Sequence, residues 1–177
     1  MKRPVGQIAG VGHAVPTRVM TNHDFAAIGV DTSDEWIVER TGIRQRYIAG
    51  PGETVASLGA EAARKAMARA SVTAAELDTI VVATSSPDRL LPAAAVELQH
   101  LLGATRSAAF DVGAACAGWI YGLAVGEGLL ASGSAETVLV VGSEKMSTII
   151  NWADRATCVL FGDGAGAVVL KRSRHQK

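Results

Sequence analysis

Residues 108–122 read AAFDVGAACAGWIYG and are the most informative segment of this sequence. A short apolar run there meets a turn of small residues carrying Cys116, and no charged residue occurs between Val112 and Gly126. A helix that is apolar on all sides is expected to be buried on all sides. In the first turn of such a helix, Cys116 lies beside unpaired backbone N–H groups and the positive end of the helix dipole, which favours thiolate over thiol. On this context alone, a nucleophile and a small buried hydrophobe are equally acceptable interpretations of Cys116.

The composition is typical of a globular domain with a real core. The chain has 177 residues, of which 49% are hydrophobic and 19% charged, and this balance excludes disorder. Lys and Arg together number 17, as do Asp and Glu, so no overall charge favours nucleic acid or a membrane surface as a partner. Two cysteines offer no disulfide framework and favour a reducing compartment, and the apolar stretch near the N-terminus is interrupted too early for a signal peptide or a membrane span. We therefore expect a cytoplasmic soluble protein.

Alternating strand and helix patterns predict an α/β fold. Strands are expected at residues 5–12, 78–84, 107–112 and 137–142, and helices at residues 31–42, 55–70, 92–102 and 116–132. This order implies right-handed βαβ crossovers and a mostly parallel sheet. Residues 158–170 differ, because two apolar runs flank Asp163-Gly164 and predict a β-hairpin with Cys158 in the core of its first strand. One domain is expected over residues 1–170, followed by a basic tail at 171–177, and no cluster of residues suggests a metal site.

The helix expected at residues 31–42 carries a second candidate site. Thr32 and Glu35 are spaced as a capping box, and Gly42 supplies the stop. Trp36 and Arg40 are four residues apart and so share one face, where an aromatic plane beside a permanent cation suits base stacking and phosphate contact. A core tryptophan flanked by an arginine that extends to solvent is the simpler interpretation, and these residues alone favour it.

Five motifs follow one another along the chain. They are DTSDEWI at 31–37, RTGIR at 40–44, FDV at 110–112 with ACAG at 115–118, VVGSE at 140–144 and FGDGAG at 161–166. In this order and spacing, the chain resembles β-ketoacyl-acyl-carrier-protein synthase III, a condensing enzyme of the thiolase-like superfamily. The resemblance implies the N-terminal half of a thiolase-like fold, which is one βαβ-type half with a mixed, mostly parallel sheet and a buried cysteine-bearing helix.

The resemblance also implies a reaction and a substrate. Cys116 corresponds to the nucleophile, which takes an acetyl or other short acyl group from acyl-coenzyme A, an acyltransferase step. Malonyl-acyl-carrier protein is then decarboxylated and condensed with that acyl group to initiate fatty acid synthesis. Thr32, Trp36, Arg40 and Arg155 correspond to the residues that hold the nucleotide end of coenzyme A, which reverses the preference for a core tryptophan. Acyl-coenzyme A is a substrate, so no permanently bound cofactor is expected.

One loop residue bears on the choice of acyl group. Leu91, just before Pro92, falls where some relatives place an aromatic side chain that reaches the partner subunit's acyl pocket. By that resemblance the smaller leucine admits a longer or branched acyl chain.

Chains of this family are about twice as long as this one. By the resemblance, these enzymes use a histidine and an asparagine of their second half for decarboxylation. The histidines present here, none of which lies in a family motif, are His13, His23, His100 and His175. We therefore expect a fragment of a full enzyme, a subunit of a split enzyme, or a non-catalytic interaction module with the thiolase fold. The partner is expected to be the missing C-terminal half or a further copy in a homo-oligomer. A cysteine hydrolase is a less suitable alternative, because Ala114 replaces the first glycine of a nucleophile elbow.

Overall fold

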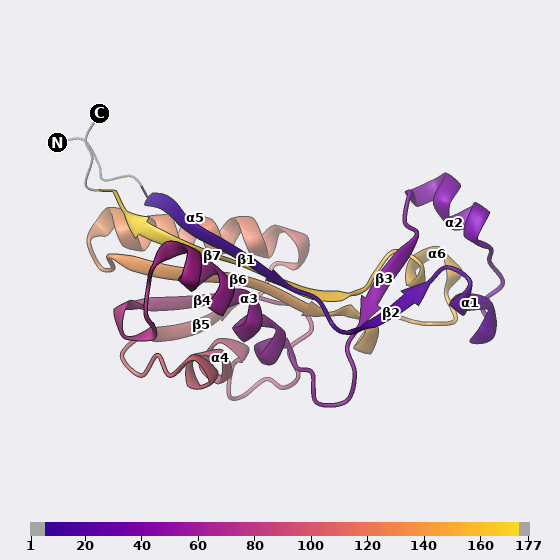
Figure 1. Ribbon diagram of the computed structural model, residues 1–177, viewed down its shortest axis with the longest axis horizontal. Coiled ribbons are helices and arrows are strands. Elements are labelled where there is room, and N and C mark those ends of the chain that lie inside the picture. Colours follow the sequence, from indigo (N-terminus) through magenta and orange to yellow (C-terminus); the bar gives the residue numbers. More distant parts are fainter. Residues whose placement is uncertain (1–5, 174–177) are drawn as a thin grey trace.

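A computed structural model describes residues 6–173, and it is built around one five-stranded sheet (Figure 1). The strands are β1 (Gly6–Ala14), β4 (Thr79–Ala83), β5 (Ala108–Val112), β6 (Thr137–Lys145) and β7 (Asp163–Arg172), in the order β1-β7-β6-β4-β5. Strand β4 is parallel to both β5 and β6, whereas β7 is antiparallel to β6 and to β1. Four strands therefore run in one direction, which confirms the expected mixed, mostly parallel sheet.

Helices cover both faces of this sheet. Helices α3 (Val55–Ala70) and α4 (Ala94–Leu102) pack on one face, and α5 (Gly118–Ser132) packs on the other (Figure 1). All five residues of β4 are buried, as its continuous apolar sequence predicts for a strand covered on both sides. On β1, a Cβ at Gly10 or Gly12 would collide with a backbone carbonyl of α3. These two glycines are therefore explained by the close approach of strand and helix.

Helix α5 is buried on one side only. Its buried residues are Gly118, Gly122, Gly126 and Leu130, and the glycine stripe lets the helix lie close to β6. On the opposite side Ile120 is 60% exposed and Tyr121 is 54% exposed. The expected burial is met on one face only, because within the described chain the sheet covers one side of this apolar helix.

The same segment meets a simple criterion for membrane-spanning helices. By length and composition, Ala115–Ser132 is apolar enough to cross a membrane, a property that core helices of globular proteins share. Its glycine face packs on the sheet, as in a core helix.

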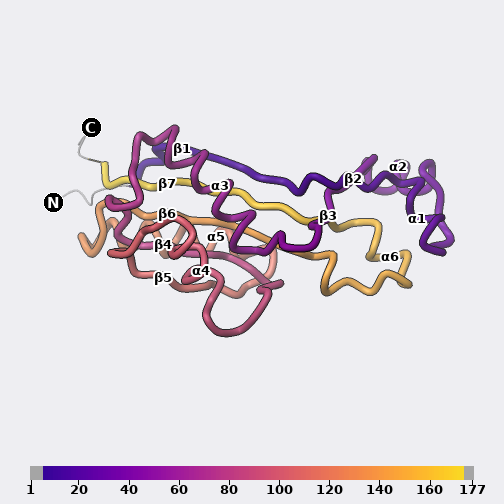
Figure 2. Tube along the Cα trace, turned by 60° about the horizontal axis from the view of Figure 1, so that its bottom comes forward, coloured from indigo at the N-terminus to yellow at the C-terminus, as the bar shows by residue number. Residues whose placement is uncertain are grey.

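A separate lobe extends from one end of the sheet, as both views show (Figures 1 and 2). Its elements are the antiparallel pair β2 (Arg18–Thr21) and β3 (Gln45–Ile48) with the helices α1 (Asp24–Ala27), α2 (Asp34–Thr41) and α6 (Arg155–Cys158). Short 3₁₀ turns occupy Ala74–Glu76, Ala115–Ala117 and Met146–Thr148. The lobe has its own small core, which includes Phe25, Ile37 and Val159. Strands β2 and β3 and helix α1 were not expected from the sequence.

The expected hairpin at residues 158–170 is wrong. Cys158 ends α6, and one strand, β7, begins at Asp163 and pairs with both β1 and β6. The Asp163 carboxylate accepts hydrogen bonds from the backbone N–H groups of Ala49 and Ser147, so Asp163-Gly164 starts a strand and makes no turn. Cys158 is fully buried as expected, although in a helix and not in a strand.

Two further boundaries differ from expectation. Helix α2 begins at Asp34, and the Ser33 hydroxyl caps it by accepting a hydrogen bond from the Trp36 N–H at 3.1 Å, so the Thr32 and Glu35 capping box is wrong. Gly42, with a φ of 73°, ends the helix as expected. Lys171 and Arg172 of the expected basic tail end β7, and residues 174–177 of that tail lie outside the described residues.

Candidate active site

Cys116 lies on the turn that joins β5 to α5. It occupies the centre of the 3₁₀ turn Ala115–Ala117, directly before the first residue of α5, so it precedes the helix that was expected to contain it. The preceding Ala115 has a φ of 46°, a left-handed conformation that alanine rarely adopts. This strained turn presents the Cys116 thiol at the carboxyl end of the sheet, where Cys116 is exposed.

A hollow of about 370 Å³ opens beside this thiol. Its lining comes from the ends of β4 and β6, the turn and helix that follow β5, and the segment before β7: Ala83, Ser85, Ala115, Cys116, Trp119, Gly142, Ser143, Glu144, Met146, Phe161 and Gly162. Gly142 gives room for the Trp119 ring, which would lie 3.2 Å from a Cβ there. The hollow sits beyond the carboxyl ends of parallel strands, where open α/β sheets bind their ligands. No histidine of the described residues lines it.

Glu144 is a lining residue that the sequence analysis did not single out. Its carboxylate accepts hydrogen bonds from the Ser85 N–H at 2.7 Å, from the Thr84 hydroxyl at 3.3 Å and from the Ser86 hydroxyl. The end of β6 is thereby tied to the loop that follows β4. The VVGSE motif at a strand end is the signal that indicates this position, since residues at the carboxyl ends of parallel strands converge on one edge.

The loop after β4 carries Leu91. A partly exposed ion pair, 2.9 Å between Lys145 Nζ and Asp88 Oδ1, anchors the loop, and Asp88 also accepts a hydrogen bond from the Val55 N–H at the start of α3. Leu91 itself is 84% exposed and precedes a cis proline. The role of Leu91 in selecting an acyl group stays a prediction.

The four residues expected at a nucleotide site lie together in the lobe. The guanidinium carbon of Arg40 lies 4.5 Å from the centroid of the Trp36 ring, and that of Arg155 lies 4.8 Å from it. Arg155 also donates a hydrogen bond to the Asp31 carbonyl at 2.8 Å, next to Thr32. The Thr32 hydroxyl oxygen is buried and has no hydrogen-bond partner among the described residues. An aromatic ring with two half-exposed guanidinium groups suits a base and its phosphates.

The cysteine hollow and this cluster are connected through one segment of chain. Met146 and Phe161 line the hollow, and the residues between them run out into the lobe, carry Arg155 and return. Such an arrangement suits an extended ligand with a nucleotide at one end and a thioester at the other. In the part of the chain that the structure describes, no group of His, Cys, Asp and Glu is placed to hold a metal ion.

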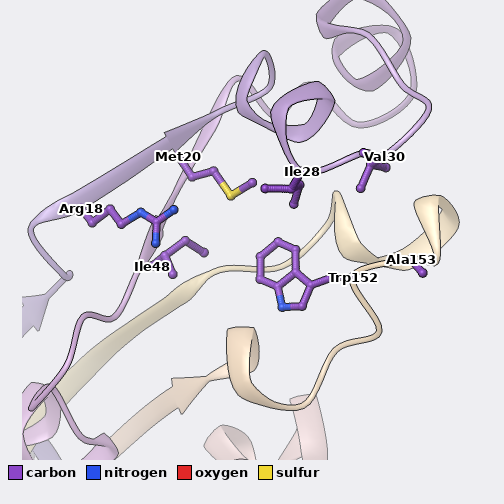
Figure 3. Close-up of a pocket in the computed structure, with 8 residues that line it drawn as sticks. Arg18, Met20, Ile28, Val30, Ile48, Trp152 and Ala153 are labelled. Atoms are coloured by element: carbon purple, nitrogen blue, oxygen red, sulfur yellow. The ribbon is translucent and has the colours of Figure 1, made fainter.

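A second hollow, of about 490 Å³, lies within the lobe (Figure 3). Its wall is mostly apolar, with the Trp152 ring facing Met20 and Ile28 and with Arg18 at the rim. The indole N–H of Trp152 donates to the Ser147 carbonyl at 3.0 Å, which holds the ring in place. None of the expected site residues lines this hollow.

Comparison with solved structures assigns this mixed sheet and its covering helices to the thiolase-like fold class of condensing enzymes. The crystal structure of 3-oxoacyl-[acyl-carrier-protein] synthase III from Aquifex aeolicus superposes with a TM-score of 0.93 and 47% identity, over 96% of this chain and 55% of that one. The priming β-ketosynthase from the R1128 polyketide biosynthetic pathway also gives a TM-score of 0.93, with 40% identity over 98% of this chain and 52% of that chain.

Sequence comparison finds similarity to one kind of condensing enzyme in that class. The family described as 3-oxoacyl-[acyl-carrier-protein (ACP)] synthase III matches residues 110–177. β-Ketoacyl-[acyl-carrier-protein] synthase III of Rhizobium rhizogenes is 56% identical over 164 residues, 93% of this chain and 50% of that protein. The protein of the same name from Xylella fastidiosa is 56% identical over 170 residues, 96% of this chain and 52% of its own length. The resemblance inferred from the sequence motifs is confirmed, and the chain spans about half the length of the curated relatives it matches.

Proposed function

We propose that this chain supplies the acyl-accepting part of a β-ketoacyl-acyl-carrier-protein synthase III. In the first step the Cys116 sulfur attacks the carbonyl carbon of an acyl-coenzyme A thioester. A new carbon–sulfur bond forms at Cys116, the bond to the coenzyme A sulfur breaks, and the cysteine proton leaves with the released coenzyme A thiol. The observation that carries this proposal is the exposure of Cys116 on a strained turn beside a hollow at the carboxyl edge of the sheet.

The nucleotide end of the substrate is assigned to the lobe. Arg40 and Arg155 pair with the phosphates, and Trp36 stacks with the adenine ring, because guanidinium groups suit phosphate oxygens and an indole offers the largest aromatic face. The unpartnered Thr32 hydroxyl supplies one further hydrogen bond. Acyl-coenzyme A acts as a substrate, and the reaction as proposed uses no resident cofactor.

The second step is decarboxylation and condensation of malonyl-acyl-carrier protein, and it needs groups beyond these residues. By the family resemblance, the hydrogen-bond donors to the malonyl thioester oxygen are a histidine and an asparagine of a second half, and no histidine of the described residues lines the hollow. The exposed side of α5, with Ile120 and Tyr121, is the surface where we place the remaining half of such an enzyme.

A second copy of the chain is placed at β5. This strand ends the sheet order, so one of its edges is unpaired within the described residues, and Phe110 on it is 38% exposed. A homo-oligomer formed along this edge would cover that surface. Both cysteines are free thiols, which is compatible with the proposed cytoplasmic location.

The experiment is acyl labelling followed by intact-mass measurement. The chain is incubated with acetyl-coenzyme A, alone and with the complementary half of the Rhizobium rhizogenes relative. We expect one acetyl group on Cys116, with β-ketoacyl product formed only when the complementary half and malonyl-acyl-carrier protein are present. Cys116→Ser should abolish labelling, whereas the control Cys158→Ala should retain it, because Cys158 is buried away from the hollow. If the two halves associate and Cys116 is never acylated, a non-catalytic interaction subunit is the correct function.

A further inference from the structure

Two polar side chains lie inside the apolar core of the lobe and have no part in the site described so far. Asn22 follows β2 and is 1% exposed, and Arg46 lies in β3 and is 5% exposed. The Arg46 guanidinium stacks on the Phe25 ring at 4.7 Å. Burial lowers the pKa of Arg46, which reflects the cost of keeping a cation in this core. Polar groups buried at such a cost need compensating hydrogen bonds.

Asn22 joins the two ends of α2. Its side-chain amide nitrogen donates to Asp34 Oδ1 at 2.8 Å, in the first residue of the helix, and to the Ile43 carbonyl at 2.7 Å, just beyond Gly42 at the helix end. Its amide oxygen accepts a hydrogen bond from Arg46 Nη1 at 2.9 Å. Only this orientation of the amide satisfies all three contacts, because two partners are acceptors and the third is a donor.

Arg46 connects Asn22 to the end of α6, on the other side of the proposed nucleotide site. Its Nη2 donates to the Val159 carbonyl at 2.9 Å, in the residue that follows α6. The stem of Arg46 also lies against the chain at Gly162, where a Cβ would approach the Arg46 Cβ to 2.8 Å, and Gly162 lines the Cys116 hollow. Asn22 and Arg46, here called the relay, thus form a continuous set of buried contacts from α2 to α6 and to the wall of the hollow.

We propose that Asn22 and Arg46 are positioning residues that set α2 and α6 at the spacing needed for the nucleotide end of acyl-coenzyme A. Trp36 is on α2 and Arg155 is on α6, so their separation depends on the contact between these two helices. Neither relay residue touches the substrate; both act through the helices that do. This inference rests on the proposed function.

The test compares two acetyl thioesters that differ only in the nucleotide. Acylation rates of Cys116 are measured with acetyl-coenzyme A and with acetyl-pantetheine, which has the same thioester and no nucleotide. The variant is Asn22→Asp, which keeps the size of the side chain and its contact with Arg46 but removes both donations to α2. We expect it to lose about 10-fold in rate with acetyl-coenzyme A and to stay within about twofold with acetyl-pantetheine.

Asn151→Asp is the matched control. It makes the same chemical change on an exposed residue of the lobe, where the side-chain oxygen only accepts a hydrogen bond from the Ala153 N–H and a carboxylate still accepts it. Both rates should be unchanged in this variant. Should Asn22→Asp fail to fold by circular dichroism, Arg46→Lys, which keeps the cation and loses the planar fork, is expected to show the same selective loss.

The outcomes separate this inference from the function on which it rests. An equal loss with both thioesters, or no loss with either, would overturn the positioning role and leave the acyl-transfer proposal standing. No acylation of the unaltered chain by either thioester would overturn both.

Discussion

The five-stranded sheet with its helices α3, α4 and α5, here called the body, and the lobe are stabilised by different kinds of interaction. Between the sheet and the helices α3 and α4, 19 buried apolar residues form one cluster, whereas the lobe core contains seven. The lobe relies in addition on buried polar contacts, above all the relay through Asn22 and Arg46 and the hydrogen bonds accepted by Asp163. Burial of apolar side chains tolerates small changes in geometry, whereas hydrogen bonds weaken quickly when distances or angles change. The sheet and its helices therefore supply most of the apolar stabilisation, whereas the lobe depends on hydrogen bonds of defined geometry, as the proposed nucleotide site would require.

The largest expected effect tests the apolar half of this comparison. Leu139 of β6 is fully buried between the sheet and α3, so Leu139→Ala removes buried methyl groups and leaves a cavity. We expect a loss of about 3 kcal/mol in the free energy of unfolding, measured by urea denaturation. Leu90→Ala, at a side chain that is 87% exposed, should change it by less than about 0.5 kcal/mol. Similar losses in the two variants would contradict the assignment of stability to this core.

An intermediate effect is expected where the lobe meets the sheet. Asp163 accepts from the Ala49 N–H at 2.7 Å and from the N–H and hydroxyl of Ser147 at 2.9 and 2.6 Å. In Asp163→Asn the side-chain NH₂ group faces one of these donors in place of a carboxylate oxygen. We expect the free energy of unfolding to fall by about 2 kcal/mol. Hydrogen exchange should rise in β2 and β3 and stay low in β4.

The control for that measurement is a carboxylate of the lobe that holds nothing in place. Glu39 has a side chain that is 80% exposed and makes only a weak contact of 3.6 Å with Arg40. Glu39→Gln should therefore leave exchange unaltered. A uniform rise across the lobe and the body in Asp163→Asn would mean that the two regions open together, and the comparison drawn above would fail.

The smallest effect concerns the two thiols. Burial, with Asp154 nearby, raises the pKa of Cys158 above its ordinary value of 9.0. Above pH 9.0 the unfolded thiol ionises while the folded thiol stays protonated, so stability falls as the pH rises. Cys158→Ala should lose this slope, so its free energy of unfolding should fall less than that of the unaltered chain between pH of about 8 and about 10 in paired urea titrations. In the unaltered chain, only the exposed Cys116 should react rapidly with a thiol reagent at neutral pH. Rapid reaction of both thiols would show that the lobe core is open.

Prediction from sequence succeeded in the body and was incomplete in the lobe for one reason. Apolar residues recur with helical period in residues 55–70, and β4 is a continuous apolar run. These patterns predict which side chains are buried. Strands β2 and β3 have only four residues each, and the buried residue Arg46 of β3 is charged. Their sequences therefore show no apolar pattern from which a strand could be predicted. The same lack of pattern made Asp163-Gly164 look like a turn, because the hydrogen bonds that start β7 come from distant residues.

From the amino-acid sequence alone follow the α/β class, the resemblance to a condensing enzyme, the prediction that Cys116 is the nucleophile, and the shared face of Trp36 and Arg40, since all of these depend on local spacing or on motifs. The stacking of Arg155 on Trp36, the place of Glu144 at the hollow beside Cys116, and the one exposed face of α5 became visible in the folded chain. These features join residues far apart in the chain, and their contacts exist only after the sheet has brought the strand ends together and the lobe has folded against them.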